Sequence, residues 1–188
     1  MLKINYRIVD DLDVLREISK ESFDLDYNCI NGFFRFLAGE QCYGDFYHEN
    51  PLQEGEMGME LLDLWLEILL EAMVELSDKN YIAFQVPDVA YLWLELKRQE
   101  DIVLINSYTD RNIQDNWTPT FRIEPMNEIT PNYESAYQVD YKKLSDLVIK
   151  VAEKFVKELQ ELNVELEKTE MVERLLQGLE NIKINQDV

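Results

Sequence analysis

Carboxylates are the most numerous ionisable side chains in this sequence, and their distribution suggests a binding surface for cations. Eleven Asp and Glu residues lie between Arg35 and Lys79, and no Lys or Arg separates those two positions. Six of the eleven follow one another at intervals of 3, 4, 4, 4 and 3 residues, namely Glu60, Asp63, Glu67, Glu71, Glu75 and Asp78. This spacing predicts a stripe along one face of a helix. Carboxylates without nearby counter-charge can attract the Lys and Arg side chains of a partner.

Nearly every other residue of this segment is apolar. We therefore expect a helix over about residues 58–78 that is packed on most sides and exposed along its carboxylates. The segment before it, residues 48–58, holds one Pro and two Gly and is expected to be a loop whose acids extend the stripe. The expected partner-binding residues are Glu54, Glu56, Glu60, Asp63, Glu67, Glu71, Glu75 and Asp78.

A second interpretation is that the stripe is only a solvated helix face in an acidic protein. Like charges at i,i+4 cost a helix roughly 0.2 to 0.5 kcal/mol per pair, so three such pairs cost about 1 kcal/mol, too little to exclude this interpretation. The C-terminal part of the chain uses the opposite pattern and mixes cations with acids: Lys150, Glu153, Lys154, Lys157, Glu158 and Glu161. Both interpretations stay open at the level of sequence.

Other chemistry has little support in the motifs. The chain has no Gly-rich phosphate loop, HExxH, CxxC or GxSxG, and its one histidine, His48, lies in the expected loop. Acids at 10–13 and 24–26 could bind a hard cation, but acids at the start of a helix are more common as caps. Cys29 and Cys42 cannot build a disulfide framework. We expect neither a metal nor a cofactor.

Composition limits the classes of partner. The chain has 188 residues and a formal net charge of −20, which argues against direct nucleic-acid binding and against an anionic membrane surface. A basic protein is the expected macromolecular partner. The length predicts a single domain over 1–188. No apolar span and no export signal are recognisable, so we expect a cytoplasmic location.

Hydrophobic periodicity predicts the strands and helices of the chain. In the first half we expect a strand over residues 2–9, a helix over 10–22, and a hairpin whose turn lies at 38–40. Three β-type runs then form an antiparallel meander, at Tyr81–Val86, Tyr91–Lys97 and Ile102–Tyr108.

The C-terminal part is harder to interpret. Residues 110–138 carry three prolines and leave room for one strand at 121–123. Asp140 is a good N-cap, and apolar residues then recur at helical spacing to about residue 182. Thr169 could cap a second segment, so one helix or two remain possible.

These elements predict an α+β fold. Its antiparallel sheet of hairpin and meander strands is packed by a central acidic helix (about 58–78) and by a long C-terminal helix or helix pair (about 140–182). Short connections between consecutive strands disfavour a parallel, doubly wound sheet.

Four segments carry a resemblance to a known class of proteins: NGFFRFL, AGEQCYGDF, LDLWLEILLEA and VAYLWLELKRQEDIVLI. Over roughly residues 28–108 the chain resembles small immunity proteins of bacterial polymorphic toxin systems. The resemblance implies a non-enzymatic cytoplasmic inhibitor that binds its cognate toxin, often a basic nuclease, and blocks the toxin's active surface. It assigns no role to any residue. Residues 110–188 lie outside it.

Three functional hypotheses follow. The first is an acidic protein-binding protein, most simply an immunity protein that docks a basic toxin on its acidic helix face. The second is an enzyme whose carboxylates bind a divalent cation. The third is an oligomeric structural or regulatory protein whose C-terminal helix pairs with that of a second copy, as a homodimer.

Overall fold

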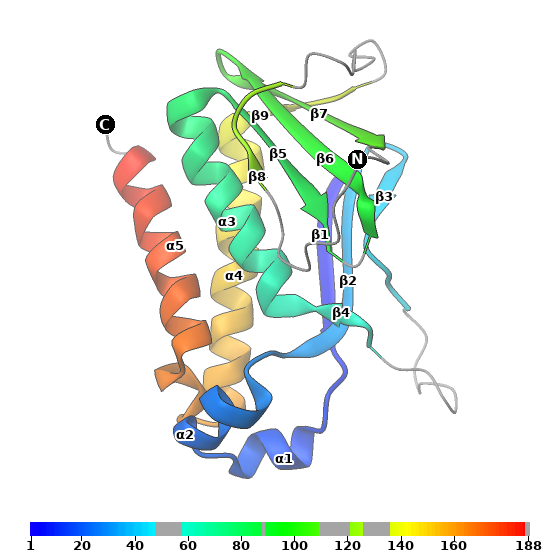
Figure 1. Cartoon of the computed structure of the whole chain (residues 1–188). Coiled ribbons are helices and arrows are strands. Elements are labelled where there is room, and N and C mark those ends of the chain that lie inside the picture. Colours follow the sequence, from blue (N-terminus) through cyan, green and yellow to red (C-terminus); the bar gives the residue numbers. More distant parts are fainter. Residues whose placement is uncertain (48–57, 88, 110–120, 126–135, 187–188) are drawn as a thin grey trace.

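The fold is α+β, as the sequence predicts, but its strands form two antiparallel sheets instead of one. We describe residues 1–47, 58–87, 89–109, 121–125 and 136–186 of a computed structural model. Three long helices lie side by side, and the sheets pack against them (Figure 1). Residues 48–57 of the expected loop lie outside the described residues. So does most of the Pro-containing region 110–138.

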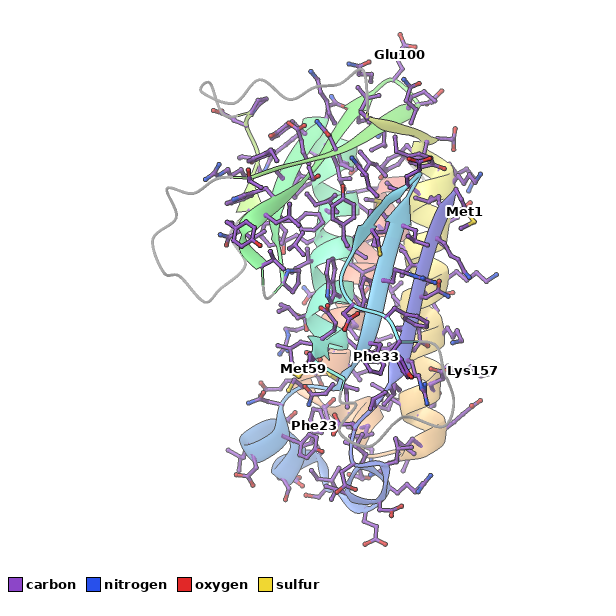
Figure 2. The ribbon with its side chains drawn as sticks, turned by 90° about the vertical axis from the view of Figure 1, so that its right-hand side faces the viewer. Met1, Phe23, Phe33, Met59, Glu100 and Lys157 are labelled. Carbon is purple, nitrogen blue, oxygen red and sulfur yellow. The ribbon has the colours of Figure 1, made fainter. Side chains whose placement is uncertain are left out.

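The first sheet contains the predicted hairpin. Strand β2 (Asn31–Ala38) pairs with β1 (Leu2–Ile8), with β3 (Gln41–Tyr43) and with the short β4 (Glu60–Leu61). All three pairings are antiparallel. Figure 2 shows β1 and β2 running alongside α4, and β1 contacts that helix.

The second sheet contains the predicted meander. Its order is β8-β5-β6-β7-β9, with β5 at Tyr81–Val86, β6 at Val89–Gln99, β7 at Ile102–Thr109, β8 at Phe121–Arg122 and β9 at Tyr137–Asp140. The sequence pattern predicts β5, β6, β7 and β8 but not β9. Strand β9 has four residues and pairs antiparallel with β7, directly before the last two long helices.

The C-terminal helical region forms two helices. Helix α4 (Tyr141–Leu162) begins after Asp140, whose Oδ1 accepts a hydrogen bond of 2.9 Å from the Lys143 backbone N–H. A short 3₁₀ turn, η3 (Leu166–Lys168), then separates α4 from α5 (Glu170–Gln186). The prediction of Asp140 as an N-cap is confirmed. Of the two alternatives for the C-terminal region, one helix or two, the structure has two.

The N-terminal helical region is broken into short pieces. The expected helix over 10–22 is instead α1 (Leu12–Glu17) and α2 (Lys20–Ser22), followed by a π-helical turn, η1 (Phe23–Tyr27). Asn28 ends this turn in the left-handed region, with φ 54°. Phe23 and Glu100, at the tip of the β6–β7 hairpin, lie toward opposite ends of the protein (Figure 2).

Helix α3 (Leu62–Lys79) occupies the centre of the fold. Its apolar residues belong to a buried cluster that also contains side chains from both sheets and from α4 and α5. The helix ends where Asn80 adopts a left-handed conformation, φ 58°, and the chain turns into β5. Within the described residues, no helix combines the length and the hydropathy needed to cross a membrane.

Candidate functional site

Glu60, the first residue of the predicted stripe, is not on the helix. Helix α3 begins at Leu62, and Glu60 lies in β4, where it pairs with Gly32 of β2. Its side chain is buried, and each of its oxygens accepts a hydrogen bond. Oε1 lies 2.7 Å from the Asp45 backbone nitrogen and Oε2 lies 2.6 Å from Trp65 Nε1. The Glu60 side chain therefore connects β4 to the backbone at Asp45, after β3, and to Trp65 in the first turn of α3.

Asp63 is also buried, with an exposed fraction of 5%. Its Oδ1 accepts a hydrogen bond of 2.8 Å from the Ile30 backbone N–H, directly before β2. Burial raises the pKa of Asp63 from its usual 3.8 to about 6, despite that hydrogen bond. The expectation that Glu60 and Asp63 lie on an exposed face is wrong, because β2 and β4 cover the start of α3.

Two further carboxylates of the stripe have counter-charges from the same chain. Glu67 Oε1 lies 2.9 Å from Nε of Arg174 on α5, and the Glu67 side chain is 26% exposed. Burial raises the pKa of Glu67, while Arg174 acts in the opposite direction. Glu75 pairs with Lys79 at 2.5 Å, one turn further along α3.

Glu71 and Asp78 match the prediction of exposed acids. Both are exposed, and neither forms an ion pair within the part of the chain that the structure describes. Burial, and then the charges of Glu75 and Glu67, raise the pKa of Glu71. Glu71 is therefore a carboxylate whose nearest charged neighbours on its own helix are also acidic. Glu54 and Glu56 lie outside the described residues.

A groove of about 270 Å³ runs beside Glu71, between α3 and α5. Leu70 and Val74 of α3 and Gly178 of α5 contribute its apolar lining. A Cβ atom at position 178 would lie 3.1 Å from the Leu70 Cβ, so glycine at this position allows the two helices to approach closely. Figure 1 shows the two helices side by side.

The polar lining of this groove is asymmetric. Helix α3 contributes Glu67 and Glu71, whereas α5 contributes Arg174, Gln177 and Asn181. Arg174 is the one cation among the described lining residues, and it is engaged with Glu67. Among the described residues, the α3 side is thus acidic, and Glu71 has no matching cation opposite it. We call this feature the α3–α5 groove.

The acids near the N-terminus serve as caps and links. Asp11 Oδ1 accepts hydrogen bonds from the backbone of Asp13 and Val14 at the start of α1. Asp10 accepts hydrogen bonds from the Tyr27 hydroxyl and the Asn31 backbone N–H. The cap interpretation is confirmed for the acids at 10–13, where Asp11 caps α1, whereas Asp24 of the acids at 24–26 lies within η1 and pairs with Lys20 at 2.6 Å. Within the described residues, no group of three or more His, Cys, Asp or Glu side chains could hold a metal ion.

The two cysteines are free thiols. Burial is the main cause that raises the pKa of Cys29, and the charges of Asp63 and Asp10 act in the same direction. A raised pKa reduces the thiolate fraction at neutral pH, so Cys29 is poorly suited to act as a nucleophile. His48 lies outside the described residues.

A buried aromatic and polar layer was not predicted from the sequence. It lies on the face of the second sheet opposite α3, where the Trp93 and Tyr108 rings stack at 6.0 Å and Arg122 lies 3.9 Å above the Trp93 ring. Glu95 and Asn106, paired across β6 and β7, share this face and are buried. The alternation of Trp93 and Glu95 with apolar residues in β6 is the one sequence signal for it.

Comparisons with known protein families, curated proteins and solved structures find no match for this chain.

Proposed function

We propose that this chain is a non-enzymatic acidic protein-binding protein that binds a Lys- and Arg-rich protein at the α3–α5 groove. The observation that carries this proposal is the position of Glu71. Its carboxylate is exposed at the rim of a groove, between Glu67 and Glu75 on the same helix, and without an ion pair in the described structure.

The electrostatics of the groove favour a cationic side chain. A Lys or Arg placed beside Glu71 relieves the repulsion among three carboxylates that are spaced by one helical turn. Its aliphatic part can pack on Leu70 and Val74 while the charged end reaches the rim. The formal net charge of −20 adds long-range attraction for a basic partner and accelerates the encounter.

The resemblance of residues 28–108 to small immunity proteins gives this binding a biological role. Under the proposal, the chain is a cytoplasmic bacterial immunity protein, and its partner is a basic toxin, for example a nuclease. The groove extends the contact surface beyond the segment of resemblance, because α5 forms its second wall.

The revised contact surface differs from the predicted stripe. Glu71 and Asp78 are its exposed, unpaired carboxylates, and Glu67 and Glu75 are partly exposed members that already have partners. Glu60 and Asp63 are excluded, because their oxygens serve the packing of β2, β4 and α3.

Co-expression with the protein encoded by the neighbouring gene tests this function. We expect the present chain to protect cells from a basic toxin encoded there and to form an isolable complex with it. The dissociation constant should rise by about tenfold or more between low and moderate salt, because the attraction is electrostatic. Toxicity that is unchanged by co-expression, or a salt-independent affinity, contradicts the proposal.

A further inference from the structure

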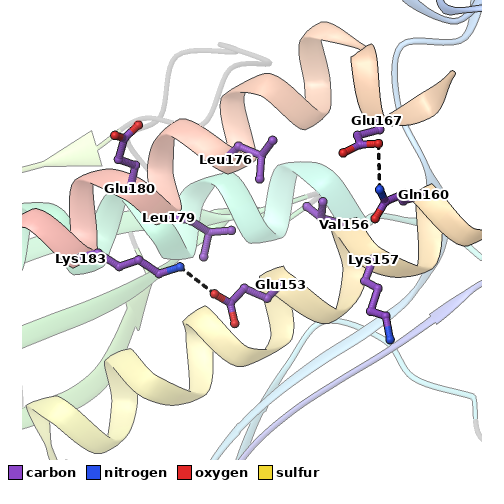
Figure 3. Close-up of a pocket in the computed structure, with 9 residues that line it drawn as sticks. All are labelled: Glu153, Val156, Lys157, Gln160, Glu167, Leu176, Leu179, Glu180 and Lys183. Carbon is purple, nitrogen blue, oxygen red and sulfur yellow. Dashed lines mark hydrogen bonds and ion pairs between the residues drawn. The ribbon is translucent and has the colours of Figure 1, made fainter. Parts of the chain in front are cut away.

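A second groove lies on the other side of α5, between α4 and α5 (Figure 3). Its volume is about 470 Å³. Its apolar lining comes from Val156 of α4 and from Leu176 and Leu179 of α5. Leu176 is 44% exposed, which is unusual for a leucine that lines a groove. We call this feature the α4–α5 groove.

The charges around this groove are mixed on both walls. Helix α4 contributes Glu153 and Lys157, and α5 contributes Glu180 and Lys183. Glu167 of η3 also lines the groove and accepts a hydrogen bond of 2.9 Å from Gln160 of α4. Glu153 Oε1 and Lys183 Nζ pair across the groove at 2.8 Å (Figure 3). Lys157 on the α4 wall pairs with Glu161 outside the groove, at 3.3 Å, and Glu180 on the α5 wall has no ion pair within the described residues.

The surrounding surface is almost neutral, unlike the rest of the protein. Residues 141–186 hold nine acidic and eight basic residues, a net charge of −1 out of −20. On α4 the charges alternate in ion pairs one turn apart, such as Lys142 with Asp146 and Lys154 with Glu158. A basic partner is therefore not attracted here, in contrast to the α3–α5 groove.

A near-neutral surface can be approached by a strongly acidic protein without strong electrostatic repulsion. Two copies of a chain with a net charge of −20 repel each other when their acidic N-terminal halves approach. Approach through α4 and α5 avoids most of that repulsion. In a two-fold arrangement the α4 wall of one copy can face the α5 wall of the other, so Lys157 and Glu180 suit an interface that must be complementary to itself.

We propose that a second copy of this chain docks on the α4–α5 groove, forming a two-fold dimer. In this dimer Leu176 of each copy is covered by the other copy. Lys157 of one copy faces Glu180 of the other. The inference goes beyond the proposed function and does not depend on it, because it concerns a different groove and a different partner.

Sedimentation equilibrium of the full chain tests the dimer. The mass of one chain is 22.3 kDa, and we expect twice this mass at a protein concentration of about 100 µM. Leu176→Glu should return the mass of one chain. Ile184→Glu is the matched control, since Ile184 is also exposed on α5, at 56%, but does not line the groove. It should remain dimeric.

Exchanging the charges of Lys157 and Glu180 tests whether these two side chains face each other across the dimer interface. Lys157→Glu and Glu180→Lys should each weaken the dimer by about tenfold, and the double variant should recover most of the loss. A wild-type chain that is monomeric at about 100 µM overturns the proposal. A dimer that tolerates Leu176→Glu, or that Ile184→Glu disrupts equally, also overturns it. Circular dichroism confirms that each variant is folded.

Discussion

Arg174 Nε lies 2.9 Å from Glu67 Oε1 and so joins the last helix to the central helix across 107 positions of the chain. This ion pair neutralises one carboxylate of a row that has no local cation between Arg35 and Lys79. It also narrows the candidate binding surface, since the first exposed acid of α3 without an ion pair in the described residues is Glu71. The acidic stripe is thus divided into a buried part, a paired part and an exposed part.

Removal of Arg174 should affect stability and binding in opposite directions. Arg174→Ala leaves Glu67 without its partner, and because the pair is partly exposed we expect a loss of only about 0.5 to 1 kcal/mol in the free energy of unfolding. The α3–α5 groove becomes more acidic, so the affinity for a basic partner should increase. Urea denaturation and calorimetric titration measure the two effects. Arg16→Ala, which breaks the exposed Arg16–Asp13 pair on α1, is the control and should leave partner affinity nearly unchanged.

Glu60 should be important for stability and not for binding. Glu60→Ala leaves the Asp45 backbone N–H and the Trp65 indole N–H without their acceptor inside the protein. We expect a loss of about 2 to 4 kcal/mol in the free energy of unfolding, because two buried donors lose charged acceptors. Urea denaturation measures it. A loss comparable to that of an exposed acid such as Asp78→Ala would contradict a structural role for Glu60.

The pH dependence of stability should carry the signature of Asp63. Its pKa is about 6 in the folded protein and its ordinary value is 3.8, so the folded state binds the proton more tightly than the unfolded state. The stabilisation is complete below the unfolded pKa and is lost as pH rises through 6, a loss of roughly 3 kcal/mol. The raised pKa values of Glu67 and Glu71 act in the same direction.

The corresponding variant is Asp63→Asn, which retains an oxygen to accept the Ile30 N–H but cannot ionise. We expect its unfolding free energy to vary less between pH 4 and 7 than that of the wild type, and to be higher at neutral pH. Thermal or urea unfolding at several pH values checks this. An equal pH dependence in both proteins would show that Asp63 does not titrate as described.

The metal-dependent alternative makes a different prediction. If the chain is a binding protein, calorimetric titration with Mg²⁺ or Mn²⁺ should give no heat of specific binding, and neither ion should raise the melting temperature. A saturable heat together with a thermal shift would favour the carboxylate-rich enzyme over the binding protein, since a ligand that binds the folded state stabilises it.

Local patterns predict much of this fold because the responsible contacts are local. The β-type run at residues 102–108 and the turn at Gly39 are sufficient to predict β7 and the β2–β3 hairpin. The cap at Asp140 marks the start of α4. Strand β9 gave no such signal, because four residues of mixed polarity depend on β7 for their conformation.

The candidate site was predictable only in part, for a physical reason. Helical spacing predicts which acids share a face, and the exposed positions of Glu71 and Asp78 follow from it. It does not predict that β4 removes Glu60 from the helix or that β2 covers Asp63. It also contains no information about Arg174, which reaches Glu67 only after α5 has packed on α3.

The affinity of a Glu71→Lys variant for the basic partner at low salt shows whether the exposed carboxylate at the rim of the α3–α5 groove binds that partner. We expect a loss of about tenfold or more, because the reversed charge repels the partner at the rim of the α3–α5 groove. The control is Asp146→Lys, an equal change of charge on α4, which should alter affinity by about twofold or less. Equal losses in the two variants would show that only net charge matters, and an unchanged affinity in Glu71→Lys would place the binding surface elsewhere.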